Sequence, residues 1–467
     1  MFIAAAYCLF LFLEFSSTQE VRYEPIRSKG RSEDTELWSK GTDEYVRGYG
    51  LSFEWLNVTT QDDVELWIHH LWNPRIEGTK VPMLMVHALA VNGDVFLLNL
   101  PEHDLAMTLA NNGYDVYMVN FRGSSYSPLS VEQYVNTSLD DCIFKDLPTT
   151  VDFVLEKTNR SDLNIVAYSK GTYVTLGLLA NSPEYNRKVR LLVLMTPVTA
   201  ISRPPLLLFS VFYFLEIGIK TFGTALANLL DTNLLLDVQH LFGVPFVIDR
   251  LAHIAPLGAQ CVWNSAFSGY PDCISRTNLN IDLLEKMFIR GFPDKAYARE
   301  VIQFSQNSKS ERFQSYSPSW FDGDAGLIFP ALKSLLAPWS DDGSLENVKE
   351  YSLSAISAPV AILQANRELF SQPKDYTRIR NSLCPNIIGG KLSPHKYVFE
   401  VNVSNYLHVD FGVGAHNDDV YVNAYYMIIR EHDLSLDSSL ATVLGYVDAD
   451  FSHLSPQSCD ICSECDR

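Results

Sequence analysis

A serine between two small residues, at the junction of two apolar segments, is the part of the sequence best suited to covalent chemistry. Ser169 follows the apolar run 164–168, which predicts a buried strand, and precedes residues 172–180, which predict a helix. Ala167 and Gly171 stand two residues before it and two residues after it. Small residues there permit the tight turn that holds a serine hydroxyl outward, next to a helix N-terminus that favours negative charge. The pattern A-x-S-x-G is typical of a nucleophile elbow, and its alternative is an ordinary strand–helix connection with a polar turn.

A serine nucleophile needs a general base, and the base needs an acid that orients it. In proteins with such an elbow, the order along the chain is serine, acid, histidine. His408 lies in the loop after the last predicted strand and is the predicted base, with His416 on the same loop as the alternative. Glu368 follows the preceding strand and is the predicted acid, with Asp375 as the alternative. A structural histidine and a solvated carboxylate are the ordinary interpretations, but the order of the three residues indicates a Ser-His-acid triad.

The negative oxygen that forms during acyl transfer needs two backbone N–H donors. One donor is the residue after the nucleophile, here Lys170, and the other belongs to the loop after an early strand. That loop begins at His87, and the N–H of Leu89 is the predicted second donor. Without Ser169 the same segment would be interpreted as a plain strand end.

The elements that must position these residues alternate between apolar strands and helices. An antiparallel hairpin opens the series, and the later alternation predicts an α/β fold with a mostly parallel central sheet covered by helices on both faces. Strands are predicted at residues 51–60, 64–72, 81–86, 114–120, 164–168, 189–195, 358–363 and 396–401. Helices are predicted at residues 105–110, 147–156, 172–180 and 418–430.

Changes of pattern divide the chain into six parts. The strand–helix alternation stops near residue 200, and a helical, aromatic-rich insertion replaces it until the sheet resumes. The predicted parts are a signal peptide at 1–18, a loose polar lead-in at 19–48, the first part of the core at 49–200, a helical cap insertion at 201–350, the second part of the core at 351–435, and a peripheral acidic tail with cysteines at 436–467.

The composition narrows the class of protein and its compartment. Hydrophobic residues make up 47% of the chain, which permits a large core, and the net charge of −19 argues against nucleic acid as a partner. The apolar run 3–13 has the length of a secretory signal and is too short for a comfortable membrane span, so no span is expected in the mature chain. Four N-x-S/T triplets agree with secretion, and they begin at Asn57, Asn136, Asn159 and Asn402.

Eight cysteines become seven if Cys8 leaves with the signal, so one is expected to stay free or to pair between chains. Cys261 and Cys273 could close a short loop. The tail carries Cys459, Cys462 and Cys465 at zinc-like spacing, with His453 as a fourth ligand to consider. An oxidising compartment favours disulfides or a free thiol instead. No metal and no cofactor are therefore predicted, and the oligomeric state is left open.

Several motifs resemble the acid lipase family, the gastric and lysosomal lipases within the α/β-hydrolases, over residues 49–430. The resembling segments are His87-Ala88-Leu89-Ala90 to H-G-L-L, residues 109–117 to L-A-D-A-G-Y-D-V-W, Asn120-Phe121-Arg122-Gly123-Ser124 to N-S-R-G-N, residues 145–153 to Y-D-L-P-A-T-I-D-F, Phe313-Gln314-Ser315-Tyr316 to F-Q-A-Y, and Leu407-His408-Val409-Asp410-Phe411 to N-H-L-D-F. The resemblance implies an α/β-hydrolase fold with a cap over an apolar cleft, neutral-lipid esters as substrates and a catalytic role for His408. It also implies a Cys261–Cys273 disulfide in the cap.

The sequence departs from the family at several site positions. The family elbow G-H-S-Q-G is here Ala167-Tyr168-Ser169-Lys170-Gly171, Ala88 replaces a glycine, and Glu368 replaces the aspartate of G-K-D-L. None of these changes removes a required atom. The predicted function is therefore a secreted or lysosomal lipase that hydrolyses triacylglycerol or steryl ester through an acyl-enzyme. The rivals are a lipid-binding or carrier protein that has lost catalysis and, less compatible with an apolar cap, a thioesterase or peptidase.

Overall fold

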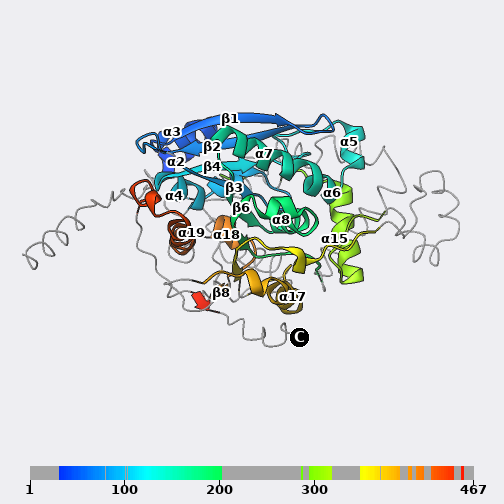
Figure 1. The fold of residues 1–467 in the computed structure, drawn as a ribbon. Helices are drawn as coiled ribbons and strands as arrows, with labels where there is room; N and C mark the ends of the chain where they lie inside the picture. Colours follow the sequence, from blue (N-terminus) through cyan, green and yellow to red (C-terminus); the bar gives the residue numbers. More distant parts are fainter. Residues whose placement is uncertain are drawn as a thin grey trace, which may run out of the picture.

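A nine-stranded sheet runs through the part of the chain that the structure describes (Figure 1). This computed structural model describes residues 31–78, 80–99, 101, 104–201, 286–287, 294–317, 348–365, 367–368, 370–389, 398–401, 406–414, 422–445 and 454–456. The strands, in chain order, are β1 (Ser52–Thr59), β2 (Glu65–Trp72), β3 (Val81–Val86), β4 (Tyr114–Val119), β5 (Leu163–Tyr168), β6 (Val189–Met195), β7 (Val360–Ala365), β8 (Val398–Val401) and β9 (Leu454–Pro456). Their order across the sheet is β1-β2-β4-β3-β5-β6-β7-β8-β9.

Helices connect these strands, and several are short. The α-helices are α2 (Arg31–Lys40), α3 (Thr42–Gly48), α4 (Leu105–Asn111), α5 (Val131–Asn136), α6 (Leu139–Asp141), α7 (Leu147–Thr158), α8 (Lys170–Asn181), α9 (Pro183–Asn186), α15 (Ala298–Ser310), α17 (Pro373–Leu383), α18 (Asp410–Val413) and α19 (Asn423–Leu436). The 3-10 turns are η1 (Gly93–Leu97), η8 (Leu353–Ala355), η9 (Cys384–Asn386) and η11 (Ser438–Thr442), and η3 (Cys142–Asp146) is a π-helix.

The prediction of a mostly parallel sheet that opens with a hairpin is confirmed. β4, β3, β5, β6, β7 and β8 pair in parallel, whereas β1 and β2 are antiparallel at one edge and β9 is antiparallel at the other. Every residue of β3, β5, β6 and β7 is buried. Such uniformly apolar strands are typical of a parallel sheet because helices cover both of its faces.

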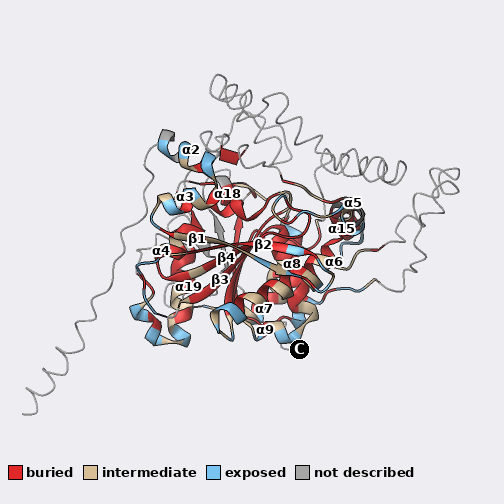
Figure 2. Ribbon diagram, turned by 90° about the horizontal axis from the view of Figure 1, so that it is seen from above, coloured by how far each residue is buried: buried red, intermediate tan, exposed pale blue. Residues whose placement is uncertain are grey.

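Two apolar layers hold the helices against the sheet. On one face, side chains of α3, α4 and α19 pack against alternate residues of the strands. On the other face, α7, α8 and α17 pack against the remaining strand residues. Figure 2 shows α4 and α19 on one side of the strands and α8 on the opposite side. This division follows from the period of two along each strand, which sends successive side chains to opposite faces.

The register aligns the carboxyl ends of four neighbouring strands, β3, β5, β6 and β7. Val86 of β3 pairs with Ala167 of β5, and the next residue of β5, Tyr168, pairs with Met195 of β6. Met195 in turn pairs with Leu363 of β7. Because loops at the carboxyl ends of parallel strands meet along one edge, segments far apart in the sequence converge there.

The prediction of a loose lead-in at 19–48 is wrong for residues 31–48, which form α2 and α3. Trp38, Tyr45 and Val46 are fully buried in the first apolar layer. The indole N–H of Trp38 donates to the carbonyl of Lys286 at 2.9 Å. These apolar residues are spaced widely among charged ones, so the segment lacks the regular apolar period by which helices are detected.

The prediction that 436–467 is peripheral is also wrong in part. β9 lies in that range and pairs with β8 as an edge strand of the sheet. Three residues are too few to produce a detectable alternation of apolar and polar positions.

Other predicted segments lie wholly or partly outside the described residues. The signal peptide falls outside them, as do most of the cap insertion, Cys261, Cys273 and the tail cysteines. Of the two described cysteines, Cys142 is a buried free thiol, whereas Cys384 is disulfide-bonded. Across the described ranges, no helix combines the length and the apolarity needed to cross a bilayer.

Truncating Trp38 to alanine tests whether the helical lead-in belongs to the folded core. Loss of a fully buried tryptophan side chain should lower the free energy of unfolding by about 3–5 kcal/mol. Urea denaturation of the purified chain measures this quantity. Leu436→Ala is the control, because a residue with 56% of its surface exposed should change stability by less than about 0.5 kcal/mol. Equal effects of the two substitutions would contradict the packing described here.

Candidate active site

Ser169 occupies a strained turn between β5 and α8. Its backbone angles are φ 53° and ψ −114°, in a region that residues with a side chain rarely enter. The Ser169 N–H donates to the carbonyl of Met195 at 3.1 Å, and the Thr172 N–H and hydroxyl both donate to the carbonyl of Ser169. The Thr172 hydroxyl also accepts from the N–H of Val198 at 2.9 Å. Neighbouring segments thus fix the turn on both sides.

Gly171 shows why the position two residues after the serine must be small. A Cβ atom added to Gly171 would lie 2.2 Å from the carbonyl oxygen of Val86 at the end of β3. Heavy atoms cannot approach that closely, so only glycine lets α8 begin against β3. The small residue that the sequence pattern requires two positions after the serine is therefore explained by the contact of Gly171 with the Val86 carbonyl.

The structure brings together Ser169, His408 and Glu368 in one hydrogen-bonded chain. Ser169 Oγ and His408 Nε2 are 2.7 Å apart, and His408 Nδ1 and Glu368 Oε1 are also 2.7 Å apart. A carboxylate only accepts hydrogen bonds, so Nδ1 carries the imidazole proton and Nε2 of the neutral ring accepts from the serine hydroxyl. Ser169 exposes 9% of its surface and His408 exposes 4%, so the chain is almost shielded from water.

The loops that carry His408 and Glu368 support one another. Arg367 and Leu407 form a parallel β-bridge, and the Arg367 N–H donates to the carbonyl of Tyr406 at 3.2 Å. This bridge places the residue after Arg367 beside the residue after Leu407. The backbone N–H groups of Phe370 and Ser371 donate to Glu368 Oε1 at 3.0 and 3.4 Å.

Asp410 and Tyr168 add contacts that sequence reasoning missed. The buried Asp410 carboxylate accepts from the Leu407 N–H at 2.7 Å and so closes the loop around His408. The Tyr168 hydroxyl donates to the carbonyl of His408 at 2.8 Å. Asp410 stands in the same short motif as His408, and a carboxylate two residues after a predicted base was a signal for such a loop contact.

The structure places the alternative acid but not the alternative base. Asp375 lies on α17, where its carboxylate accepts from Arg378 of the same helix at 3.4 Å. The acid in contact with His408 is Glu368. The alternative base, His416, lies outside the described residues.

The loop after β3 carries the predicted second donor, Leu89. His87 Nε2 accepts from the N–H of Phe121 at 3.1 Å, so its proton is on Nδ1, which donates to the carbonyl of Ala88 at 2.8 Å. Burial and the charge of Lys170 lower the pKa of His87 well below its ordinary value, so the ring is neutral. Ala90 has a positive φ of 54° and marks the turn that follows Leu89.

Lys170, the other predicted donor, has a buried side chain. Its ammonium group lies 2.7 Å from a carboxylate oxygen of Glu300 on α15, and the two side chains expose 4% and 0% of their surface. Burial opposes the charge, but the Glu300 carboxylate, together with Cys142 and Asp146, raises the pKa of Lys170 above its ordinary value. Burial also raises the pKa of the Glu300 carboxyl, although Lys170 acts in the opposite direction.

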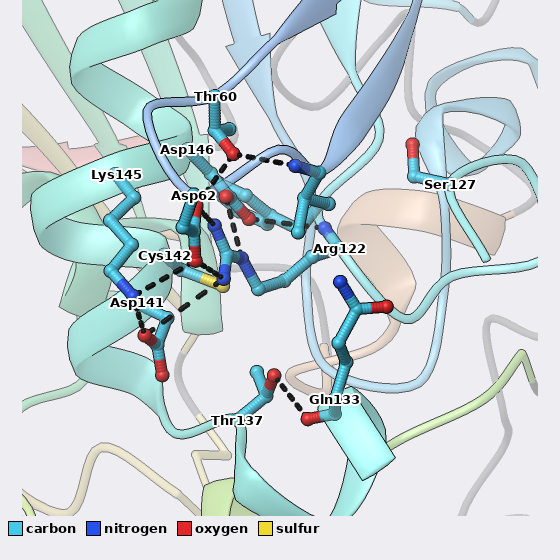
Figure 3. Close-up of polar contacts among 12 residues, drawn as sticks. Thr60, Asp62, Arg122, Ser127, Gln133, Thr137, Asp141, Cys142, Lys145 and Asp146 are labelled. Atoms are coloured by element: carbon cyan, nitrogen blue, oxygen red, sulfur yellow. Dashed lines mark hydrogen bonds and ion pairs between the residues drawn. The ribbon is translucent and has the colours of Figure 1, made fainter. Parts of the chain in front are cut away.

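A second ionic cluster surrounds Arg122, in the motif that follows β4 (Figure 3). Its guanidinium group donates to Asp146 at 2.7 Å and to Asp62 at 2.8 and 3.0 Å. Hydrogen bonds from Arg122 outweigh burial and hold the pKa of Asp62 well below its usual range. Lys145 pairs with Asp62 and with Asp141. The cluster ties the β1–β2 turn to the start of α7 and has a structural role.

Three of the four predicted glycosylation sites are described, and each is exposed. Asn57 lies on β1, Asn136 ends α5, and Asn159 follows α7 with a positive φ of 50°. Asn402 lies outside the described residues. Among the residues with described positions, no three His, Cys, Asp or Glu side chains are arranged to hold a metal ion.

Ser169 lies on a strained strand–helix turn and is hydrogen-bonded to His408, which in turn contacts Glu368. These features, on a mostly parallel sheet, define the class of protein. Residues 81–415 match the α/β hydrolase fold family, and the chain belongs to that family. The predicted fold class is therefore confirmed, while the helical cap stays a prediction.

Named relatives then specify the resemblance. Lipase member K of Homo sapiens is 24% identical over 379 residues, which cover 78% of this chain and 84% of that protein. Gastric triacylglycerol lipase of Bos taurus is 24% identical over 394 residues, 80% of this chain and 87% of that protein. Lipase member N of Mus musculus is 23% identical over 363 residues, 74% of this chain and 81% of that protein. The predicted resemblance to the acid lipases is confirmed.

Substituting Gly171 by alanine tests the close approach of α8 to β3. The added methyl group would meet a backbone carbonyl that cannot move aside, and overpacking of this kind should lower the free energy of unfolding by about 2–3 kcal/mol. Urea denaturation measures the change.

Gly177→Ala, in the same helix, is the matched control. Its methyl group would meet the side chain of Ile143, which can rotate, and alanine favours the helix by about 1 kcal/mol over glycine. Equal losses of stability in the two variants would mean that the Val86 contact does not set the size of residue 171.

Proposed function

We propose that this protein is a lipase that hydrolyses carboxylic esters of neutral lipids with Ser169 as nucleophile. The observation that carries the proposal is the hydrogen-bonded chain from Ser169 through His408 to Glu368. Membership of the α/β hydrolase family supports a hydrolytic reaction, and the named relatives support an ester of a lipid as substrate.

The proposed reaction proceeds in two halves. Ser169 Oγ attacks the ester carbonyl carbon while His408 Nε2 takes the serine proton, and the carbonyl π electrons move to oxygen. When the tetrahedral intermediate collapses, the C–O bond to the alcohol breaks and His408 returns the proton to the leaving oxygen. Water then attacks the acyl-enzyme with the same base, releasing the fatty acid and restoring the serine. No cofactor takes part in these steps.

Each remaining group has a role in this scheme. Glu368 holds the proton-bearing Nδ1 and stabilises the imidazolium that forms when Nε2 takes the serine proton. The N–H groups of Leu89 and Lys170 donate to the negative oxygen of the intermediate. The low exposure of the three triad residues strengthens these interactions because little water competes for them.

The relatives and two sequence features support a proposal for the substrate and the compartment. Triacylglycerol is the substrate in the name of one relative, and triacylglycerol or steryl ester is proposed here. A secreted or lysosomal location is proposed from the signal-like run 3–13 and from the glycosylation triplets, of which Asn57, Asn136 and Asn159 are exposed. A lipid carrier without catalysis is the alternative, and labelling of the serine separates the two.

Reaction with a fluorophosphonate tests the nucleophile. The purified chain should form an adduct that mass spectrometry maps to Ser169, because a hydrogen-bonded histidine activates the hydroxyl. Ser169→Ala should form no adduct and should lose ester hydrolysis by about 10⁴-fold or more.

Circular dichroism of Ser169→Ala provides the folding control. A folded wild-type chain that takes no label in detergent, yet binds a fluorescent triacylglycerol analogue equally well with and without Ser169, would instead establish the carrier.

Replacing Glu368 by glutamine tests the assignment of the acid. The neutral amide cannot stabilise the imidazolium, so kcat should fall by about 10³- to 10⁴-fold, as expected for the orienting acid of a serine triad. Asp375→Asn is the matched variant, since it neutralises the alternative acid, and it should keep kcat within about threefold. The reverse result would move the acid to Asp375.

A further inference from the structure

Lys170 lies directly after the nucleophile in the chain, yet its charge is enclosed by protein. Besides the ion pair with Glu300, its ammonium group lies 5.3 Å from the ring centroid of Phe121 and 5.7 Å from that of Tyr297. A buried ammonium needs a partner of opposite charge, because removing one partner leaves an uncompensated charge in a poorly solvated site. The position of the Lys170 side chain therefore depends on Glu300.

The segment that carries Glu300 also touches the loop after β3. The Asp294 N–H donates to the carbonyl of Ala90 at 2.7 Å. The Asp294 carboxylate accepts from the Asn92 side chain at 2.8 Å and from the N–H of Ser125 at 3.0 Å. Asp294 thus joins the loop after β3 to the loop after β4.

The contacts of Glu300 with Lys170 and of Asp294 with Ala90 both bear on where the predicted oxyanion donors lie. The N–H groups proposed to bind the oxyanion belong to separate segments, that of Leu89 to the loop after β3 and that of Lys170 to the first residue of α8. Residues 294–300 contact the residue after Leu89 through Asp294 and the side chain of Lys170 through Glu300. One short segment therefore connects the loop after β3 with the start of α8.

We propose that Asp294 and Glu300 are positioning residues that fix the separation of the two oxyanion donors. The proposal rests on the proposed function, because it concerns how the same site binds the transition state. Neither residue is assigned contact with the substrate. Both act through the backbone that carries the N–H groups of Leu89 and Lys170, which are proposed to contact the substrate. Oxyanion stabilisation requires donors held close to the place where the charge develops.

Replacing Glu300 by glutamine in the full chain is the first test. Lys170 would lose its counter-charge, its side chain would move, and the first turn of α8 would move with it. A displacement of about 1 Å can cost about 100-fold in rate, so kcat for a soluble ester should fall by about 10- to 100-fold. KM should change by less than about threefold, since ground-state binding does not use the oxyanion donors.

The double variant Lys170→Gln/Glu300→Gln provides a rescue that a structural defect would not show. It keeps the backbone N–H of residue 170 and replaces the ion pair by two amides that can hydrogen-bond to each other. Its kcat should return to within about fivefold of the wild type, whereas Lys170→Gln alone, which leaves a buried carboxylate unpaired, should resemble Glu300→Gln.

Asp433→Asn is the matched control for loss of a buried ion pair. Asp433 is buried and pairs with Arg190 at 2.8 Å, and it also accepts from Asn164 near the opposite end of β5 from Ser169. This variant should lower Tm while leaving kcat unchanged. A fall in kcat that follows Tm equally in Asp433→Asn and Glu300→Gln would overturn the proposal.

Asp294→Asn tests the positioning role if Glu300→Gln does not fold. The amide keeps the shape of the side chain but removes one of the two acceptors for Asn92 and Ser125, and kcat should again fall about 10-fold with KM little changed. Wild-type kcat in a folded Asp294→Asn or Glu300→Gln variant would overturn the positioning role. Absence of both labelling and turnover in the wild type would instead refute the proposed function itself.

Discussion

The contact between the start of α8 and the end of β3 is the constraint on which the site depends. Gly171 approaches the Val86 carbonyl so closely that no side chain fits between them. This approach forces Ser169 into a positive φ, a conformation that costs about 1–3 kcal/mol for a residue with a side chain. Burial of β5 on both faces offsets the cost. The result is a hydroxyl that faces the histidine loop instead of the helix axis.

The parallel sheet explains how a single turn can meet partners from distant parts of the chain. The loops after β3, β5 and β7 leave the sheet at the same end of the strands. This is because β3 pairs with β5, and β5 and β7 both pair with β6, close to the last residue of each strand. The loop after β8 then meets the loop after β7 through the bridge between Arg367 and Leu407. Contacts between neighbouring segments thus add to those within each loop, and the hydrogen bond from the Asp294 N–H to the Ala90 carbonyl is a further example.

Local chemical patterns allowed much of the site to be predicted. Ser169 could be found because the turn requires small neighbours, and His408 and Glu368 because their order along the chain follows from the strand order. The strands at the centre of the sheet were predictable for a similar reason: a strand covered on both faces is apolar at every residue.

What could not be predicted depends on contacts between distant residues. Glu300 pairs with Lys170 across 130 positions, and nothing near Glu300 distinguishes it from a solvated acid. The lysine itself was the available signal, since a charge at the start of a buried helix requires a partner. Trp38 was missed because its packing partners, such as Lys286, are remote in sequence, and β9 because three residues carry no period.

The distance in sequence between Ser169 and His408, 239 positions, has a consequence for biosynthesis. Domains fold as the chain emerges from the ribosome, N-terminal parts first. The strained turn, with its neighbours on β3 and β5, can form while the histidine loop has not yet been made. The hydrogen bond between Ser169 and His408 can therefore form only after the segment that follows β8 has been made. In this topology the order of synthesis itself separates the formation of the turn from the completion of the site.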